Sequence, residues 1–142
     1  MKKIFQYTLI LLIAAIYLTG CSKDTAGAET SLSYKMISDK TWYLDYAQTF
    51  TGTSVKTKTY VGQSTYFINF LKNLTTVDSD GISGIYTIEK INGQLQIQVQ
   101  AKTSNGGSIE YIYTIESMGD KHMVLTYTIS TVTTKLFYSN KN

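Results

Sequence analysis

The sequence lacks several residue types on which common functional sites depend. Its 142 residues include no arginine and no proline, one cysteine and one histidine. One thiol cannot form a disulfide within the chain or supply the cysteines of a structural zinc site. Nucleic-acid recognition relies heavily on guanidinium groups, so we expect no nucleic-acid partner despite a formal charge of +3. These absences favour a binding or structural role over catalysis.

The N-terminus carries a membrane-targeting pattern. Two lysines at positions 2 and 3 precede a mostly apolar segment over 4–18. This segment is short for a transmembrane helix, which needs about 20 apolar residues, and is typical of a secretory signal. Residues 18–21 (Leu-Thr-Gly-Cys) follow and resemble the lipobox of bacterial lipoproteins, which ends in an acylated cysteine. The alternative is an ordinary signal peptide with a coincidental Cys21.

The lipobox resemblance implies a division of the chain and a location. Residues 1–20 become a signal peptide, and 21–30 a flexible tether of small and polar residues. Acyl chains on Cys21, palmitate among them, would hold the protein in a lipid bilayer. Ser22 stands where aspartate directs inner-membrane retention in enteric bacteria, so we expect the outer membrane, with the periplasmic or surface face left open.

The remaining residues, 31–142, have the pattern of one β domain that begins with a short helix over 31–38. The clearest strand is Gln-Leu-Gln-Ile-Gln-Val-Gln over 94–100, in which strict alternation places three aliphatic side chains on one face. Asn92-Gly93 before it suits a tight hairpin turn, because both residues tolerate positive φ. Similar patterns predict strands at 40–48, 54–60, 64–71, 73–78, 82–91, 94–102, 108–118 and 121–139, the last with a break near 130–133.

These strands predict an all-β fold in which each strand pairs with its sequence neighbours. An antiparallel up-and-down meander of about eight strands leaves two exposed edges unless it closes, so we expect a small barrel. The absence of proline agrees, because proline disrupts central strands. A two-sheet sandwich is the structural alternative.

The order of landmarks over 37–139 resembles the lipocalin-like lipoprotein domains of Bacteroidetes. A tryptophan-bearing strand over 37–44 comes first, a Gly-x-Tyr-x-Ile strand over 84–88 follows an Asp-Gly turn, and a late strand covers 123–127. The resemblance implies a lipocalin-like β-barrel in a lipid-anchored protein of the cell envelope. It implies fold and location more directly than an activity.

A barrel of this size has an interior that is either filled by side chains or large enough for one small ligand. Buried tyrosine hydroxyls need a hydrogen-bond partner, so an inward tyrosine stripe favours a ligand cavity with polar groups. The alternative is that tyrosine simply suits sheet faces. The residues that we predict to line the interior and bind ligand are Trp42, Tyr46, Phe70, Tyr86, Ile88, Leu95, Ile97, Tyr111, Tyr113, Leu125 and Tyr127.

No catalytic or metal-binding set is apparent. His122 is the only imidazole and follows a predicted turn, so we expect it to be exposed. Asp-Ser-Asp-Gly over 78–81 lacks the distal ligands of a calcium loop and predicts a turn. We therefore expect no enzyme activity, no metal and no cofactor.

Two functions remain. The first is a lipid-anchored barrel that binds a small apolar or amphipathic ligand. The alternative is a protein-interaction module of the envelope, either an enzyme inhibitor or an accessory subunit of an outer-membrane complex. Its motivation is the Thr- and Ser-rich segments over 49–59 and 130–134. The sequence does not name the protein partner.

Overall fold

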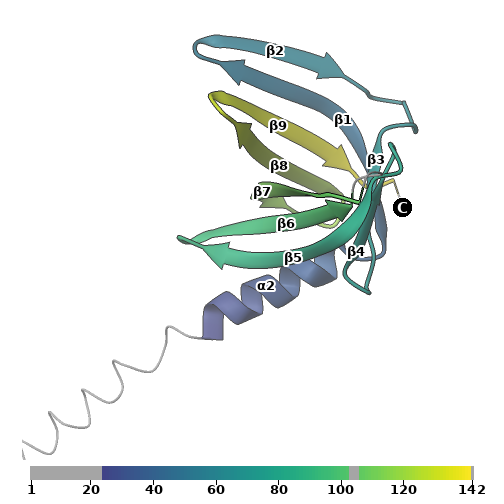
Figure 1. Ribbon diagram of the computed structural model, residues 1–142, viewed down its shortest axis with the longest axis vertical. Coiled ribbons are helices and arrows are strands. Elements are labelled where there is room, and N and C mark those ends of the chain that lie inside the picture. Colours follow the sequence, from purple (N-terminus) through teal and green to yellow (C-terminus); the bar gives the residue numbers. More distant parts are fainter. Residues whose placement is uncertain (1–23, 103–105, 142) are drawn as a thin grey trace, which may run out of the picture.

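The structure is a computed structural model that describes residues 24–102 and 106–141 (Figure 1). The lipobox and Cys21 lie outside the described residues. One helix precedes nine strands: α2 (Asp24–Ile37), β1 (Lys40–Thr51), β2 (Ser54–Thr59), β3 (Phe67–Phe70), β4 (Thr75–Asp78), β5 (Ser83–Ile91), β6 (Gln94–Lys102), β7 (Ser108–Met118), β8 (His122–Ile129) and β9 (Val132–Ser139).

The strands form one antiparallel sheet that closes on itself. Strand β1 pairs with β3 over 40–43 and with β9 over 43–51. Eight strands therefore make a closed barrel, and β2 is an extra strand on the far half of β1. This confirms the predicted meander and small barrel, and it rules out the two-sheet sandwich.

Most strand bounds follow the alternation in the sequence. Strands β6 and β7 coincide with the predicted 94–102 and 108–118. The predicted 121–139 is two strands, β8 and β9, joined at a turn where Ser130 has a φ of 56°. Asn92 and Gly93 have φ values of 51° and 81°, as the tight hairpin between β5 and β6 requires.

A bulge in β1 changes which face its side chains occupy. The pairing of β1 with β9 shifts register between Leu44 and Tyr46. Leu44 lies opposite Tyr138, which packs against the core, whereas Tyr46 lies opposite Phe137 and stacks on it at a ring-centroid distance of 4.2 Å. Neighbours along β9 alternate between faces, so Tyr46 is on the outer face. The prediction that Tyr46 lines the interior is wrong, because the extra bulge residue reverses the alternation.

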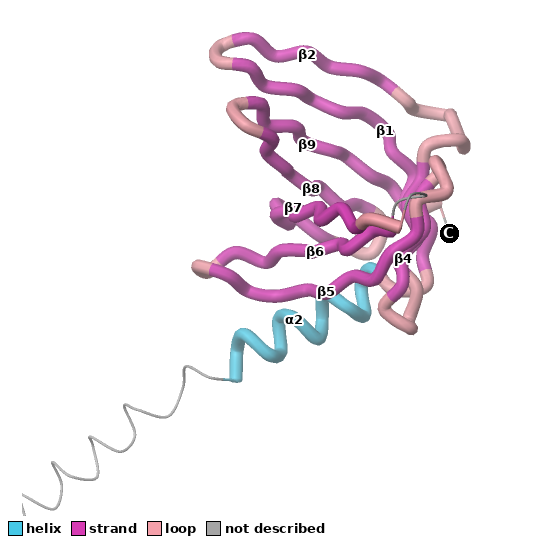
Figure 2. Tube along the Cα trace, in the orientation of Figure 1, coloured by secondary structure: helices cyan, strands magenta, loops and turns pink. Residues whose placement is uncertain are grey.

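Helix α2 begins earlier than the sequence predicted and lies along β5 (Figure 2). It starts at Asp24 and not near residue 31, so the expected tether over 21–30 is helical from Asp24 onward. Tyr34 Oη accepts a hydrogen bond from the Ile88 amide at 2.6 Å, and Glu29 pairs with Lys90 at 2.5 Å. Strand β4 is short and pairs with β5 only as far as Ile85, and the helix covers the part of β5 that follows. In the described part of the chain, no helix has the length and apolarity to cross a membrane.

The end of the barrel next to α2 is packed solid, and we call it the closed end. Ile37, Trp42, Phe70 and Met123 have no exposed surface, and Tyr86 is 1% exposed. Trp42 donates its indole N–H to the Ile37 carbonyl at 3.2 Å. The helix terminus and the barrel wall therefore share one core.

Candidate functional site

The opposite part of the barrel interior is hollow. A cavity of about 180 Å³, here called the mouth cavity, lies between β3, β4, β5, β6 and β7. Its lining is aromatic and aliphatic with two carboxylates: Ile68, Thr76, Asp78, Asp80, Ile82, Gly84, Val99, Tyr111 and Tyr113. An adjacent outer hollow of about 490 Å³ shares Asp80, Ile82 and Tyr111 with it. The mouth cavity therefore adjoins the surface of the barrel at the β4–β5 loop.

Tyr111 and Tyr113 line the mouth cavity, and two further inward tyrosines, Tyr127 and Tyr138, lie behind them. The rings of Tyr111 and Tyr113 lie 6.3 Å apart and nearly parallel, and Tyr127 meets Tyr113 edge-on at 5.8 Å. Tyr138 comes from the neighbouring β9 and packs against the core. Within residues 24–102 and 106–141, none of these four hydroxyls has a hydrogen-bond partner.

The tyrosines of the closed end are different, because their hydroxyls are paired. Tyr86 Oη donates to the Leu71 carbonyl at 3.1 Å and lies 3.2 Å from Ser38 Oγ. Tyr34 Oη accepts from the Ile88 amide, as described above. The closed end and the mouth therefore differ in whether the hydroxyls of their inward tyrosines are paired.

Ionisation of Tyr113 and Tyr138 is suppressed. Burial, with smaller effects from Tyr111, Tyr127 and the Asp78 carboxylate, raises the pKa of Tyr113 to about 12. Burial also raises the pKa of Tyr138, and Asp78 adds to this effect. Both phenols are therefore neutral at physiological pH and retain a proton to donate.

The Asp78 carboxylate is held in place by the turn that follows β4. Its Oδ1 accepts hydrogen bonds from the amides of Asp80 at 3.0 Å and Ile82 at 2.9 Å. Gly81, with a φ of 77°, donates to the Asp78 carbonyl at 3.1 Å. The turn predicted from Asp80-Gly81 is confirmed. In the described part of the chain, no group of three or more potential metal ligands exists.

The predicted interior residues divide between the two ends. Six of them form the closed end and are at most 2% exposed: Trp42, Phe70, Tyr86, Ile88, Ile97 and Leu125. Leu95 packs against this core from its edge. Tyr111 and Tyr113 line the mouth cavity, and Tyr127 contacts Tyr113.

The sequence prediction missed the carboxylates of the cavity wall. Asp78 lies two residues after Thr76, which is buried, so strand alternation places both on the inner face. Alternation alone indicates an inward Asp78, whereas the Asp-Ser-Asp-Gly pattern over 78–81 indicates only a turn. His122 lies at the start of β8 and is exposed, as predicted.

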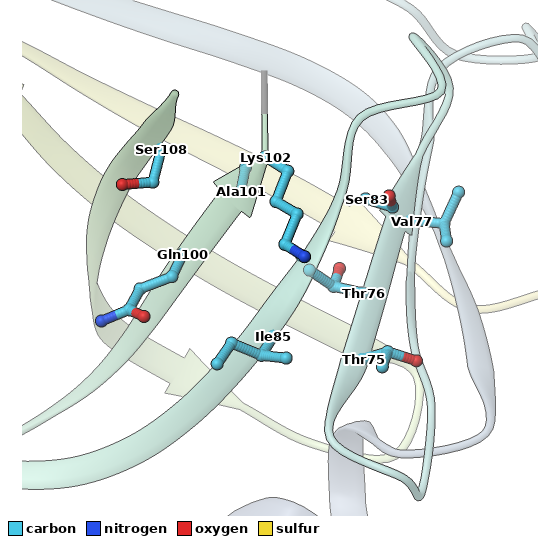
Figure 3. Close-up of a pocket in the computed structure, with 10 residues that line it drawn as sticks. Thr75, Thr76, Val77, Ser83, Ile85, Gln100, Ala101, Lys102 and Ser108 are labelled. Atoms are coloured by element: carbon cyan, nitrogen blue, oxygen red, sulfur yellow. The ribbon is translucent and has the colours of Figure 1, made fainter. Parts of the chain in front are cut away.

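A larger hollow lies over the junction of β4, β5 and β6 (Figure 3). It has a volume of about 610 Å³ and includes Ile85 and Gln100, which face each other across β5 and β6. Gly84 makes the junction possible, because a Cβ there would lie 2.4 Å from the Gln100 carbonyl oxygen. Among the described residues that line this hollow, Lys102 alone has a charged side chain, so no acidic side chain accompanies this base there.

The mouth cavity has the chemistry of a binding site. Apolar walls with a few directed polar groups are typical of small-molecule pockets. Searches with this chain found no matching family model, curated protein or solved structure. The functional interpretation therefore depends on the residues of the cavity.

Proposed function

We propose that this chain is a lipid-anchored, lipocalin-like envelope protein, of the kind found in Bacteroidetes, that binds a small apolar or amphipathic molecule without catalysis. The ligand occupies the mouth cavity. The observation that carries this proposal is the set of inward tyrosines whose hydroxyls have no partner in the described chain: Tyr111, Tyr113, Tyr127 and Tyr138.

The unpaired hydroxyls of the mouth support a ligand. Buried polar groups in proteins are nearly always hydrogen-bonded, and the closed end meets this requirement at Tyr86 and Tyr34. In the described part of the chain, the side-chain atoms that are fully buried and unpaired are Asn69 Oδ1 and Thr126 Oγ1, so the hydroxyls of the mouth tyrosines reach solvent. A ligand that displaces water from these hydroxyls would accept or donate the same hydrogen bonds.

The volume of the cavity limits the size of its ligand. Pockets for drug-sized molecules have volumes of roughly 300–1,000 Å³. The mouth cavity, at about 180 Å³, is smaller. It therefore suits a molecule with one ring or a short chain, or one end of a longer amphiphile that continues into the outer hollow.

The position of α2 indicates how the ligand enters. Asp24 begins the helix three residues after Cys21, so acyl chains on that cysteine hold the helix near the bilayer, by our proposal at the outer membrane. The helix packs on β5 and seals the closed end. The mouth cavity adjoins the β4–β5 loop, where ligand enters from water.

Native mass spectrometry tests the binding proposal. The Cys21→Ser chain, incubated with an envelope lipid extract, is expected to retain a small molecule. Tyr113→Leu should reduce the retained fraction, and Tyr46→Leu on the outer face should not. A protein that retains nothing contradicts the proposal. Metabolic labelling with a palmitate analogue tests the anchor, because Cys21→Ser should abolish the label.

A protein-interaction module is the second candidate, and one observation favours it. Strand β2 lies outside the closed barrel, and all six of its residues are exposed. The hairpin of β1 and β2 is therefore available for contact with another protein. Capture from envelope extract should then depend on Val55, which is 53% exposed, and not on Tyr113.

A further inference from the structure

We infer that the mouth cavity selects molecules with an ammonium group over molecules with a carboxylate. This inference rests on the proposed ligand-binding function and names the chemical class of the ligand. Its basis is the combination of one fixed carboxylate, that of Asp78, and tyrosine rings at one cavity.

The charge at the cavity is negative. Its lining includes Asp78 and Asp80 and no lysine; Asp80 is exposed and screened by solvent, so Asp78 is the main source of this charge. Asp78 is only partly exposed, and its Oδ1 is held by two backbone amides. The second carboxylate oxygen has no partner in the described residues. A cation in the cavity would supply that partner, as a charge-assisted hydrogen bond.

One lysine close to the cavity, Lys102, does not cancel this negative charge. It lines the outer hollow and the hollow over β4, β5 and β6, and it is exposed. In Figure 3 its side chain extends toward β5 near Thr76. Solvent screens an exposed charge, so Lys102 neutralises Asp78 only weakly.

The aromatic rings provide the second attraction for a cation. Tyr113 has Tyr111 beside it at 6.3 Å and Tyr127 at 5.8 Å in an edge-on orientation. Aromatic faces attract ammonium groups, and clusters of such rings recognise them in proteins. The rings also supply the apolar contact that the rest of an amphipathic amine needs.

A carboxylate ligand meets the opposite environment. It would lie near Asp78 in a partly buried space, where like charges repel more strongly than in water. The tyrosine hydroxyls could donate to it, but they donate equally well to an alcohol. The cavity therefore discriminates by charge and not only by hydrogen bonding.

Three probes with the same apolar body test this discrimination. They are 2-phenylethylamine, 2-phenylethanol and 3-phenylpropionate, which carry a positive, neutral and negative head group at neutral pH. Isothermal titration calorimetry with the full chain in a non-ionic detergent measures each Kd. We expect the amine to bind at least tenfold more tightly than the acid, with the alcohol between them.

Two variants assign the preference to its cause. Asp78→Asn keeps an oxygen that can accept the amides of Asp80 and Ile82, but it removes the charge. It should raise the Kd of the amine to that of the alcohol and leave the Kd of the alcohol unchanged. Glu110→Gln is the matched control, because it removes one charge from the outer face of β7, beside Tyr111. It should preserve the amine preference.

The outcomes separate the two proposals. Amine preference that is lost in Asp78→Asn and kept in Glu110→Gln supports the inference. Equal binding of the three probes, or tighter binding of the acid, overturns the inference and leaves ligand binding in place. Failure of all three probes to bind overturns the inference, and a protein that also retains nothing from the lipid extract in native mass spectrometry overturns the ligand-binding proposal.

Discussion

The closed end and the mouth use the same residue type in different ways. At the closed end, Tyr86 is 1% exposed and its hydroxyl is paired with Leu71 and Ser38. At the mouth, Tyr111 and Tyr113 stand beside a cavity with unpaired hydroxyls. Tyrosine therefore stabilises the fold at one end and presents polar groups at the other.

The difference between the ends follows from what covers them. Helix α2 supplies Ile37 and Tyr34 to the closed end, and these fill the space that the eight strands leave. No helix in the described chain covers the mouth, where the β4–β5 loop contributes Asp78 and Asp80. One end is thus specialised for stability, and we expect the other to be tolerant of change and responsible for binding.

The largest effect is expected from a cavity at the closed end. Phe70 has no exposed surface and contacts Tyr86 at a ring-centroid distance of 5.0 Å. Phe70→Ala should lower the free energy of unfolding by about 3–5 kcal/mol, as for buried aromatic residues generally. Urea denaturation measures this change. Ile109→Ala at the rim, where Ile109 is 45% exposed, should cost about 1 kcal/mol or less. Equal losses would remove the distinction between the ends.

Alkaline pH should weaken the mouth specifically. The pKa of Tyr113 is raised to about 12 from an ordinary value of 10, so folding favours its neutral form. The stability that comes from this preference is present below pH 10 and is lost between about pH 10 and pH 12. At about 1.4 kcal/mol per pKa unit, the loss is about 2–3 kcal/mol.

The measurement is the free energy of unfolding against pH for the parent protein and Tyr113→Phe. The variant should lose less stability above pH 10, because it has no phenol to ionise at that position. Tyr46→Phe on the outer face is the control and should follow the parent curve. Parallel curves for the parent protein and Tyr113→Phe would contradict the burial of Tyr113.

A smaller loss is expected when one hydroxyl is removed from the closed end. Tyr86→Phe deletes the hydrogen bond to the Leu71 carbonyl at 3.1 Å and the contact with Ser38 Oγ. We expect the free energy of unfolding to fall by about 1–2 kcal/mol, the usual effect of losing a paired, buried hydroxyl. Urea denaturation at pH 7 is sufficient, and an unchanged midpoint would show that the pairing contributes nothing.

The sequence predicted the barrel better than it predicted the inner surface. The strand bounds followed from alternation and turn residues, as at Asn92-Gly93. The prediction that Tyr46 points inward failed, because a single bulge residue reverses the faces of the residues that follow it in β1 and leaves no local pattern in the sequence. The early start of α2 also escaped, because the small residues over 24–30 show no apolar periodicity even though alanine favours helices.

The candidate site was only partly predictable for a related reason. Alternation identifies an inward side chain such as Tyr113 or Phe70, but it does not say which end of the barrel is filled. That depends on where α2 docks, which is a tertiary property. Asp78 became recognisable as part of the site only when the loop after β4 was placed beside Tyr113.

The smallest effect on stability is expected from the hydroxyl that defines the mouth. Tyr113→Phe removes one oxygen, as Tyr86→Phe does, but that oxygen has no partner in the described chain. The free energy of unfolding at pH 7 should therefore change by no more than about 0.5 kcal/mol. Retention of the small molecule in native mass spectrometry should nevertheless fall. A loss of stability as large as that of Tyr86→Phe would mean that the Tyr113 hydroxyl supports the fold, and it would remove the main reason to place a ligand beside it.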